Sequence, residues 1–327
     1  MDFITGTGID WVVAIQALGG WLEMPMRFLT FLGSEDFFFI VLPLIYWSID
    51  AKVGLQVGLI LATNNFINSV FKLLFASPRP YWVSDQVRPV VGESSFGVPS
   101  GHAQNAAAIW GIVAHGIHRS WAWVAAGILI FLIGFSRPYL GVHFVQDVLA
   151  GWLLGGLVLV LFSRLWEPAA RWIAGMTFAR QVGLAFVIAV LMVLVGALLV
   201  AGLDGFVIPQ EWLDNARPSG VEPDPVSLEG FITTAGSFFG LAAGAAWIAT
   251  QGGYQTSGPL EKRAMRYVVG VIGVLILWMG LGQVFPDDAN LISYFLRFLR
   301  YTLVGFWVTG GAPWLFFHFK LADRPKM

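Results

Sequence analysis

Long, nearly uncharged apolar segments constrain this chain more than any other feature of its sequence. Several of them reach the length of about 18 residues that a membrane-spanning helix requires. The mean hydropathy is +0.72 and only 12% of the residues are charged, whereas soluble domains carry about 25% charged residues. We therefore predict an all-α, polytopic helical membrane protein.

About nine transmembrane helices and one interfacial helix are expected. The amphipathic, tryptophan-flanked segment at residues 9–22 is too short to span a bilayer and should lie in its interface. The candidate spans lie near residues 28–48, 53–75, 100–118, 121–137, 142–164, 181–203, 231–250, 267–285 and 293–318. The start of the chain lacks a basic region, an apolar stretch and a cleavage site, so we expect no removable signal peptide.

The distribution of Lys and Arg predicts the orientation of the chain, because cytoplasmic connections are enriched in these residues. The connections and the tail on one side of the predicted spans contain 11 of them, and the connections on the other side contain 5, or 7 if Arg297 and Arg300 are included. The richer side should be cytoplasmic. We therefore expect a multi-pass protein of the cell membrane, with its N-terminus outside and its C-terminus in the cytoplasm.

The composition argues against several other classes of protein. The formal net charge of −1 disfavours a nucleic-acid-binding protein, which would carry a basic patch. Because the chain has no Cys, it offers no disulfide framework, thiol nucleophile or thiolate metal site. The histidines outside the polar strings described below, His115, His118 and His318, form no metal-ligand cluster with carboxylates, so we expect neither a metal nor another cofactor. A four-residue repeat of Gly236, Gly240 and Gly244 indicates close helix packing within the chain or in a homodimer.

Three short polar strings interrupt the apolar background, and the first contains Lys72 and Arg79 followed by Pro80. Lys72 should lie in the last turn of the second span, because Pro78 and Pro80 prevent the helix from continuing. A forked guanidinium and a compact ammonium both suit phosphate oxygens. Alternatively, both residues are ordinary interfacial anchors.

The second string is Pro99-Ser100-Gly101-His102, at the start of the third span. Ser is a favoured N-cap, Gly lets the backbone approach a ligand, and the free amides of a helix N-terminus attract an anion. His102 is placed to donate a proton to a leaving oxygen. Simple capping beside an interfacial histidine is the alternative interpretation.

The third string runs from Ser136-Arg137 to His143 and Asp147. The spacing of four between His143 and Asp147 predicts that they share one helix face. Asp147 would then accept a hydrogen bond from one imidazole nitrogen and leave the other as a nucleophile. Arg137, expected in extended backbone because Pro138 follows it, adds a third cation. An ordinary ion pair is the alternative, but charged groups at the mouth of a span are costly and usually functional.

All three strings lie where predicted spans begin or end, and the alternating direction of the spans puts them on the same, extracytoplasmic side. Together they contain three cations, two histidines, one carboxylate and a Ser-Gly pair. This set of side chains is suited to a phosphate site with a histidine nucleophile.

In this order, the motifs Lys-x6-Arg-Pro, Pro-Ser-Gly-His and Ser-Arg-x5-His-x3-Asp resemble the tripartite signature of the type 2 phosphatidic acid phosphatase superfamily. The resemblance covers about residues 28–165. It implies a metal-independent phosphomonoester or diphosphate hydrolase of the acid phosphatase and vanadium haloperoxidase type. His143 would attack phosphorus, Asp147 would orient it, and His102 would protonate the leaving group. The residues that would hold the phosphoryl oxygens are Lys72, Arg79, Ser100, Gly101 and Arg137.

The resemblance also suggests a division of the chain. Residues 1–166 are expected to form the interfacial helix and a five-span phosphatase core. Residues 167–327 are expected to form a four-span C-terminal extension of unknown role.

Two branches of the superfamily are candidates. Nine spans, an outside N-terminus and the string Arg-Pro-Tyr-Trp at residues 79–82 resemble the glucose-6-phosphatase branch, whose pattern has Gln at the position of Asp147. Residues 141–151 resemble bacterial lipid phosphatases. We favour hydrolysis of phosphatidate or a polyprenyl phosphate, with a sugar phosphate as the alternative. A lipid phosphotransferase would use the same residues, and a lipid transporter or headgroup-binding scaffold is the alternative without catalysis.

Overall fold

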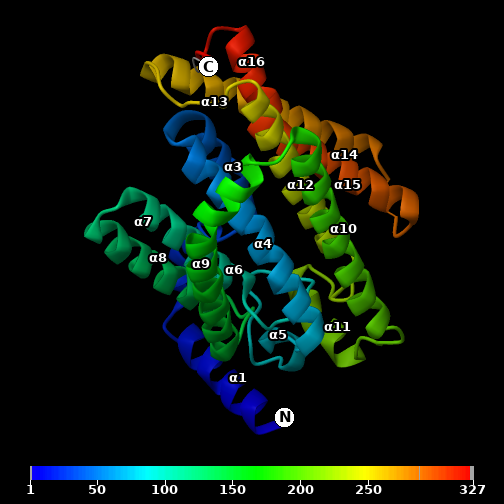
Figure 1. Cartoon of the computed structure of the whole chain (residues 1–327). Coiled ribbons are helices and arrows are strands. Elements are labelled where there is room, and N and C mark those ends of the chain that lie inside the picture. The colour runs from blue at the N-terminus through cyan, green and yellow to red at the C-terminus, as the bar shows by residue number, and fades with distance from the viewer. Residues whose placement is uncertain (1, 287, 325–327) are drawn as a thin grey trace. The chain divides into compact units, whose positions relative to one another are not determined.

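The computed structural model describes residues 2–286 and 288–324, and every regular element among them is a helix (Figure 1). The all-α prediction is confirmed. The chain forms two compact units that interleave along the sequence. The first unit contains the residues up to Phe37, Ile67–Val160 and Gly196–Ser227, and the second contains Phe38–Phe66, Leu161–Val195 and the residues from Leu228 onward. The division expected near residue 166 follows chain order and stays a prediction.

Seven helices in the described part of the chain are long and apolar enough to cross a membrane. They are Ala51–Val83 (α4, Ala51–Phe75, with α5, Pro80–Val83), Ser120–Tyr139 (α8), Val145–Ala174 (α9), Phe178–Gly202 (α10), Glu229–Thr250 (α12), Leu260–Val284 (α13, Leu260–Leu275, to α14, Leu281–Val284) and Leu291–His318 (α15, Leu291–Phe306, to α16, Ala312–His318). An eighth results if Gly20–Phe31 and Glu35–Ile49 count as one broken span. The multi-pass membrane protein is confirmed, but the expected number of nine spans is not.

The span expected at residues 28–48 is broken near its start. Helix α2 (Glu23–Phe31) ends, and α3 (Glu35–Leu44) begins after a short turn. Ser34 Oγ accepts a hydrogen bond from the backbone N–H of Phe37 at 3.2 Å, as the cap of a new helix does. Acidic residues in the first turn of α3 also favour a helix start there. These local signals interrupt an otherwise apolar run.

The span expected near residues 100–118 is a short helix. Residues 101–117 form α6 (Gly101–Asn105), η3 (Ala106–Trp110) and α7 (Gly111–Ile117) in direct succession. Ser100 begins this helix as predicted, because its Oγ accepts a hydrogen bond from the backbone N–H of Ala103 at 3.5 Å. The helix ends at His118, which has left-handed backbone with a φ of 55°. It is shorter than the roughly 20 residues of a typical span.

The N-terminal helix differs in its limits from the interfacial segment expected at residues 9–22. Helix α1 (Asp2–Gln16) starts and ends earlier, and the short helix η1 (Gly20–Leu22) follows it. Gly19 separates the two with a φ of 109°, which a residue without Cβ adopts readily. The interfacial position of α1 stays a prediction.

In the first unit, α8 is the central helix. Helices α1 and α2 and the segment from α6 to α7 all pack against it, and Figure 1 shows α7 and α8 side by side. The start of α9 approaches α6 closely, since a Cβ on Gly151 or Gly155 would lie 2.6 or 2.3 Å from the carbonyl oxygen of Ser100 or Gln104. Small residues therefore let the helix ends that contain the polar strings come together.

In the second unit, α12 packs along α15. A Cβ on Gly240 would lie 2.2 Å from the carbonyl oxygen of Thr302, and Gly236 and Gly244 make similarly close contacts with the same segment. The glycine repeat is therefore used for packing within the chain, the first of its two predicted uses, while a homodimer stays a prediction. Elsewhere in this unit, Trp47 of η2 (Ile45–Ile49) donates its indole N–H to the carbonyl oxygen of Val308 at 2.7 Å.

Candidate active site

Each polar string lies at a helix end in the first unit. In the first string, Lys72 is in the last turn of α4 and Arg79 directly precedes α5. In the second, Ser100 caps α6, and Gly101 and His102 are in its first turn. In the third, Arg137 is in the last turn of α8, His143 lies in the turn that follows, and Asp147 is in the first turn of α9. Several of these side chains are buried, so their polar groups require partners. The hydrogen bonds that satisfy them connect the three strings.

His143 and Asp147 form the centre of this network. Nδ1 of His143 lies 3.3 Å from Oδ2 of Asp147, and both side chains are buried. The same carboxylate oxygen accepts a hydrogen bond from the backbone N–H of Phe144 at 2.9 Å. This contact resembles the second half of a capping box. The two residues do not share a helix face as predicted, because α9 begins only at Val145. Asp147 reaches back over the helix start instead.

This arrangement defines which imidazole nitrogen is available. If Nδ1 donates its proton to Asp147, Nε2 keeps its lone pair, and Nη1 of Arg79 lies 3.1 Å from it as a donor. Burial, assisted by the charges of Arg79, Arg137 and Lys72, lowers the pKa of His143 well below its usual value. The side chain is therefore neutral at physiological pH, with an unprotonated Nε2.

Arg79 connects the second and third strings to the first. Its buried guanidinium donates from Nε to the carbonyl oxygen of Ser95 at 2.6 Å, and from Nη2 to that of Phe96 at 3.2 Å. Nη1 donates to the carbonyl oxygen of Val142 at 2.9 Å. Since these carbonyls belong to the segment before α6 and the turn before α9, one rigid fork of donors sets the distance between both segments.

Two residues of the loop between α5 and α6 lie among the predicted phosphate-binding cations. Ser95 Oγ accepts hydrogen bonds from Lys72 Nζ at 2.7 Å and from Arg79 Nη2 at 3.1 Å. The carboxylate of Glu93 lies 2.5 Å from Nη2 of Arg137 and 3.5 Å from Nη2 of Arg79. The three cations therefore have oxygen partners supplied by the protein itself.

Arg137 is helical rather than extended, contrary to the sequence-based expectation. Helix α8 continues through Pro138 to Tyr139. The proline is tolerated because its missing N–H removes a single backbone hydrogen bond just before the helix ends. The Arg137 side chain is buried and donates to Thr30 Oγ1 of α2 as well as to Glu93.

Asn68 of α4 holds the second string in place. Its buried amide nitrogen donates to the carbonyl oxygen of Pro99 at 3.2 Å and to Oε1 of Gln104 at 2.7 Å. A Cβ on Gly101 would lie 3.3 Å from Asn68 Oδ1, tighter than an ordinary contact. Glycine therefore fits this position because the string passes directly over α4.

The backbone ties the second string to the third. The N–H of Ser100 donates to the carbonyl oxygen of Asp147 at 2.9 Å. His102 follows in the first turn of α6 and is partly buried. The predicted proton donor is thus in the first turn of α6, the predicted nucleophile lies just before α9, and the starts of these two helices are hydrogen-bonded to each other.

Glu93 is the counter-ion of this cluster. Burial by itself would raise the pKa of its carboxyl, but the charges of Arg79 and Arg137, with smaller contributions from His102 and Lys72, outweigh that effect and hold the pKa well below its usual range. The side chain is 26% exposed, whereas its two arginine partners are almost fully buried. Glu93 is therefore ionised at neutral pH.

Sequence reasoning missed Glu93, Ser95 and Thr30. Thr30 lies in an apolar helical segment, and neither of the other two stands at a spacing that suggests chemistry. The one available signal was a carboxylate in the short loop that joins two cation-containing motifs. Such a loop must pass near both motifs.

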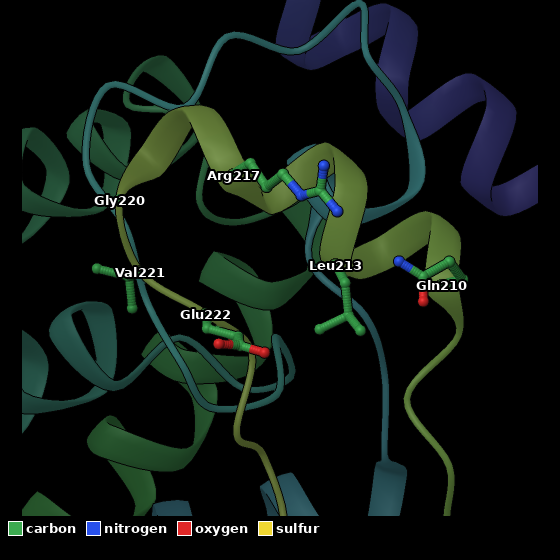
Figure 2. Close-up of a pocket in the computed structure, with 6 residues that line it drawn as sticks. All are labelled: Gln210, Leu213, Arg217, Gly220, Val221 and Glu222. Atoms are coloured by element: carbon green, nitrogen blue, oxygen red, sulfur yellow. The ribbon is translucent and has the colours of Figure 1, made fainter.

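A separate pocket of about 340 Å³ lies beside α11 (Gln210–Ala216) in the first unit (Figure 2). Its lining residues are Gln210, Leu213, Arg217, Gly220, Val221 and Glu222. Arg217 is paired with Asp214 at 2.9 Å and is 75% exposed. Because no predicted site residue lines this pocket, the buried network of the three strings is the better candidate for an active site.

Metal-ligand chemistry has little support in the described residues. Among residues 2–286 and 288–324, no group of three or more His, Asp or Glu side chains is placed to hold a metal ion. The positive charges of Lys72, Arg79 and Arg137 instead lie close enough to lower the pKa of His143. A set of positive donors suits an anionic ligand.

Comparison with known proteins assigns the family. Residues 53–171 match the PAP2 superfamily, and residues 232–324 match the PAP2 superfamily phosphatase transmembrane extension. Phosphatidylglycerophosphatase B of Bacillus subtilis (strain 168) is 35% identical over 167 residues, which cover 46% of this chain and 78% of that protein. Glucose-6-phosphatase 3 of Bos taurus is 27% identical, over 100% of this chain and 99% of that protein.

Solved structures are also similar to this chain, and one of them is a bacterial enzyme. The crystal structure of a transmembrane PAP2-type phosphatidylglycerolphosphate phosphatase from Bacillus subtilis matches with 29% identity and a TM-score of 0.45, over 51% of this chain and 88% of that chain. The apolar helices and the sequence relationships define an integral-membrane phosphatase. The chain belongs to the type 2 phosphatidic acid phosphatase (PAP2) superfamily, as its motifs implied.

Proposed function

We propose that this protein hydrolyses the phosphate ester of a membrane lipid, a phosphatidate or a polyprenyl phosphate, without a metal ion and through a phosphohistidine. The observation that carries the proposal is the chain of contacts from Asp147 through His143 to Arg79. It combines an oriented, neutral imidazole with a cation at the nitrogen that would react. Arg137 shares the partner Glu93 with Arg79, and Lys72 shares the partner Ser95 with it, so both cations lie near Arg79.

In the first half-reaction, Nε2 of His143 forms a bond to phosphorus while the bond from phosphorus to the ester oxygen breaks. Asp147 keeps its hydrogen bond to Nδ1 and stabilises the positive charge that the ring acquires. Burial and the charge of Arg137 lower the pKa of His102, so this side chain takes up a proton only with the bound phosphate dianion, and it gives that proton to the departing oxygen so that the alcohol leaves uncharged. Lys72, Arg79 and Arg137, with the backbone at Ser100 and Gly101, stabilise the phosphoryl oxygens.

In the second half-reaction, a water molecule attacks the phosphohistidine. His102, neutral after the first step, takes a proton from the water as the oxygen bonds to phosphorus. The bond between phosphorus and Nε2 breaks, and its electron pair returns to the imidazole. Inorganic phosphate then leaves, and both histidines are back in their starting states.

Independence of a metal ion is proposed from the character of the side chains. In many phosphoryl-transfer enzymes Mg²⁺ neutralises the charge on the phosphoryl oxygens. Here Lys72, Arg79 and Arg137 supply three positive charges, two of them on almost fully buried side chains. A charge in a buried site of low polarity acts more strongly than the same charge in water.

A lipid is the favoured substrate because the site lies at helix ends. On the predicted topology these ends are at headgroup depth, so a lipid would bind with its tail still in the bilayer. Each methylene kept in apolar surroundings contributes about 0.8 kcal/mol. Asp147, together with similarity to phosphatidylglycerophosphatase B, also favours a lipid phosphatase.

A soluble sugar phosphate is the second candidate. The similarity to glucose-6-phosphatase 3 extends over 100% of this chain, including the C-terminal region that a smaller lipid phosphatase does not match. Sugar hydroxyls would require polar partners around the site. The acidic residues of the loop after α10 are candidates for that role.

The purified full-length protein should be tested for phosphate release from a panel of substrates, in detergent with EDTA present. We expect kcat/KM to rise with chain length in a series of phosphate monoesters, and glucose 6-phosphate to be a poor substrate. Activity abolished by EDTA and restored by Mg²⁺ would contradict the metal-independent mechanism. More efficient cleavage of glucose 6-phosphate than of every lipid phosphate would replace the lipid by the sugar.

A further inference from the structure

The carboxylate of Glu93 occupies the position where a phosphoryl group is expected. Its two oxygens face Nη2 of Arg137 at 2.5 Å and Nη2 of Arg79 at 3.5 Å. A carboxylate and a phosphate present similar pairs of acceptor oxygens to guanidinium groups. Beside it, Ser95 Oγ accepts from Lys72 and Arg79, as a further phosphoryl oxygen would.

We propose that Glu93 is an internal anionic ligand of the phosphate site, which a substrate phosphate must displace before it binds. The inference rests on the proposed function, because it assumes that Arg79 and Arg137 bind the phosphoryl group. It assigns to Glu93 the role of setting the affinity of the site for phosphate. The low pKa of Glu93 supports it, since the carboxylate stays charged near neutral pH.

Displacement requires movement of a side chain and not of the loop. The backbone of Glu93 is held on both sides, since its N–H donates to Tyr81 Oη at 3.0 Å and its carbonyl oxygen accepts from Tyr81 Oη at 2.9 Å. The carbonyl oxygen of Ser94 accepts from the N–H of Asp224 at 2.9 Å. The Glu93 side chain, in contrast, is 26% exposed, so a rotation of its torsions takes the carboxylate to water.

The contact of the Glu93 carboxylate with Arg79 and Arg137, called the closed contact below, also compensates the charges of these buried arginines in the absence of substrate. An unpaired buried charge is costly, and Arg137 is almost fully buried. Glu93 compensates this charge before substrate binds, and the substrate phosphate compensates it in the complex. Because the same displacement precedes the binding of every ligand, it lowers the affinity for all phosphate-like anions by one common factor.

The experiment compares the full-length wild type with Glu93→Gln in detergent. Inhibition constants are measured at pH 8 against p-nitrophenyl phosphate for methyl phosphate, a dianion, and dimethyl phosphate, a monoanion. We expect Glu93→Gln to lower both constants by the same factor, about tenfold if the closed contact is tenfold favoured in the wild type. Glu211→Gln, which removes an exposed carboxylate of α11, is the matched control and should change neither constant.

Two results would overturn the proposal. Weaker or unchanged binding of both anions in Glu93→Gln means that Glu93 orients the arginines for phosphate. A much larger gain for the dianion than for the monoanion means that Glu93 stays beside the bound ligand and repels it. If Glu93→Gln does not fold, Glu93→Asp takes its place. Its shorter carboxylate reaches both arginines less well, so the inhibition constants should again fall together, and unchanged or higher constants overturn the proposal.

The wild type separates this inference from the proposed function. If the wild type neither hydrolyses p-nitrophenyl phosphate nor is inhibited or stabilised by phosphate esters, the proposed function itself fails. If the wild type is active and only the effect of Glu93→Gln has the wrong sign, the inference about Glu93 fails alone.

Discussion

At the scale of single residues, the two histidines have different surroundings. His143 is buried and has a partner at each ring nitrogen, Asp147 at Nδ1 and Arg79 at Nε2. His102 is partly buried in the first turn of α6. The first environment suits a nucleophile of fixed orientation, and the second suits a group that meets the leaving oxygen at the edge of the site.

Substitution should therefore affect the two histidines differently. His143→Ala should abolish turnover, because no other side chain takes over the attack on phosphorus. His102→Ala should reduce kcat for an alkyl phosphate by about 10²–10⁴-fold, the usual value of a general acid. The loss for p-nitrophenyl phosphate should be smaller, since nitrophenolate leaves without a proton. Steady-state kinetics on both substrates test this, and equal losses for His102→Ala would contradict the assigned role.

Asn68 should act as a positioning residue for the second string. Asn68→Ala removes the hydrogen bonds to Pro99 and Gln104 and leaves buried groups unsatisfied, which costs about 1–3 kcal/mol. We expect a lower melting temperature and a greater loss of kcat on an alkyl phosphate than on p-nitrophenyl phosphate, because His102 follows this string. Ser69→Ala, the neighbouring substitution on α4, is the control. A purely structural role would lower the activity on both substrates equally.

At the scale of helices, small residues decide how closely the elements approach. Gly151 and Gly155 of α9 face the carbonyl oxygens of Ser100 and Gln104 at the start of α6, and Gly240 of α12 faces α15. In a bilayer, where apolar surface alone gives little preference for helix over lipid, such close contacts are a main source of helix association.

Gly240→Ala should destabilise the second unit. Its new Cβ would lie 2.2 Å from the carbonyl oxygen of Thr302, so α12 and α15 must separate. Overpacking of this kind costs about 1–3 kcal/mol. Gly183→Ala is the matched control, because nothing lies within 4 Å of its Cβ position in α10. Thermal unfolding in detergent should show a lower midpoint for Gly240→Ala than for the wild type or Gly183→Ala. Equal midpoints for the two variants would mean that the close contact between α12 and α15 does not determine the stability of the protein.

At the scale of the whole molecule, orientation in the membrane rests on the distribution of Lys and Arg. The predicted extracytoplasmic side contains 5 of them in its connections, and the predicted cytoplasmic side contains 11. On this predicted topology, the Lys and Arg residues of the candidate site belong to the side with fewer positive charges. Their retention there is easier to explain by function than by orientation.

Single cysteines test this orientation directly, because the chain has 0 Cys of its own. Gln86→Cys, in the loop before the second string, and Gln255→Cys, in the loop before α13, are exposed and chemically matched. In intact cells a membrane-impermeant thiol reagent should label Gln86→Cys and spare Gln255→Cys. Both should react after the membrane is permeabilised, and the reverse pattern in intact cells would invert the topology.

Much of the fold follows from local physics that the sequence displays. Apolar runs predicted helices long enough to span, and the limits of α4 agree with them because prolines follow Lys72 and end the helix. Ser100 was predicted as an N-cap because Ser is a favoured residue at that position, before an apolar helix. The break at Ser34 was missed because the surrounding apolar run outweighed a single polar cap in the pattern.

The candidate site shows where sequence reasoning ends. The residue types and their order predict Lys72, Arg79, His102, Arg137 and His143 as candidates, because a phosphate site would need cations and a nucleophile. The pairing of His143 with Asp147 was predicted, but for a reason that proved wrong, since the two meet across a helix start and not on one face.

The class of protein and the chemical character of its polar strings could be predicted without the fold, because apolar length and residue type act locally. The positions of Glu93 and Ser95 among the cations, and the contacts by which Arg79 connects the strings, became visible in the folded chain alone. Those contacts join residues from separate helix ends. No periodicity along the chain predicts these contacts. They form because charged groups that are buried in the folded protein require oxygen partners, and the partners are those that the fold brings near.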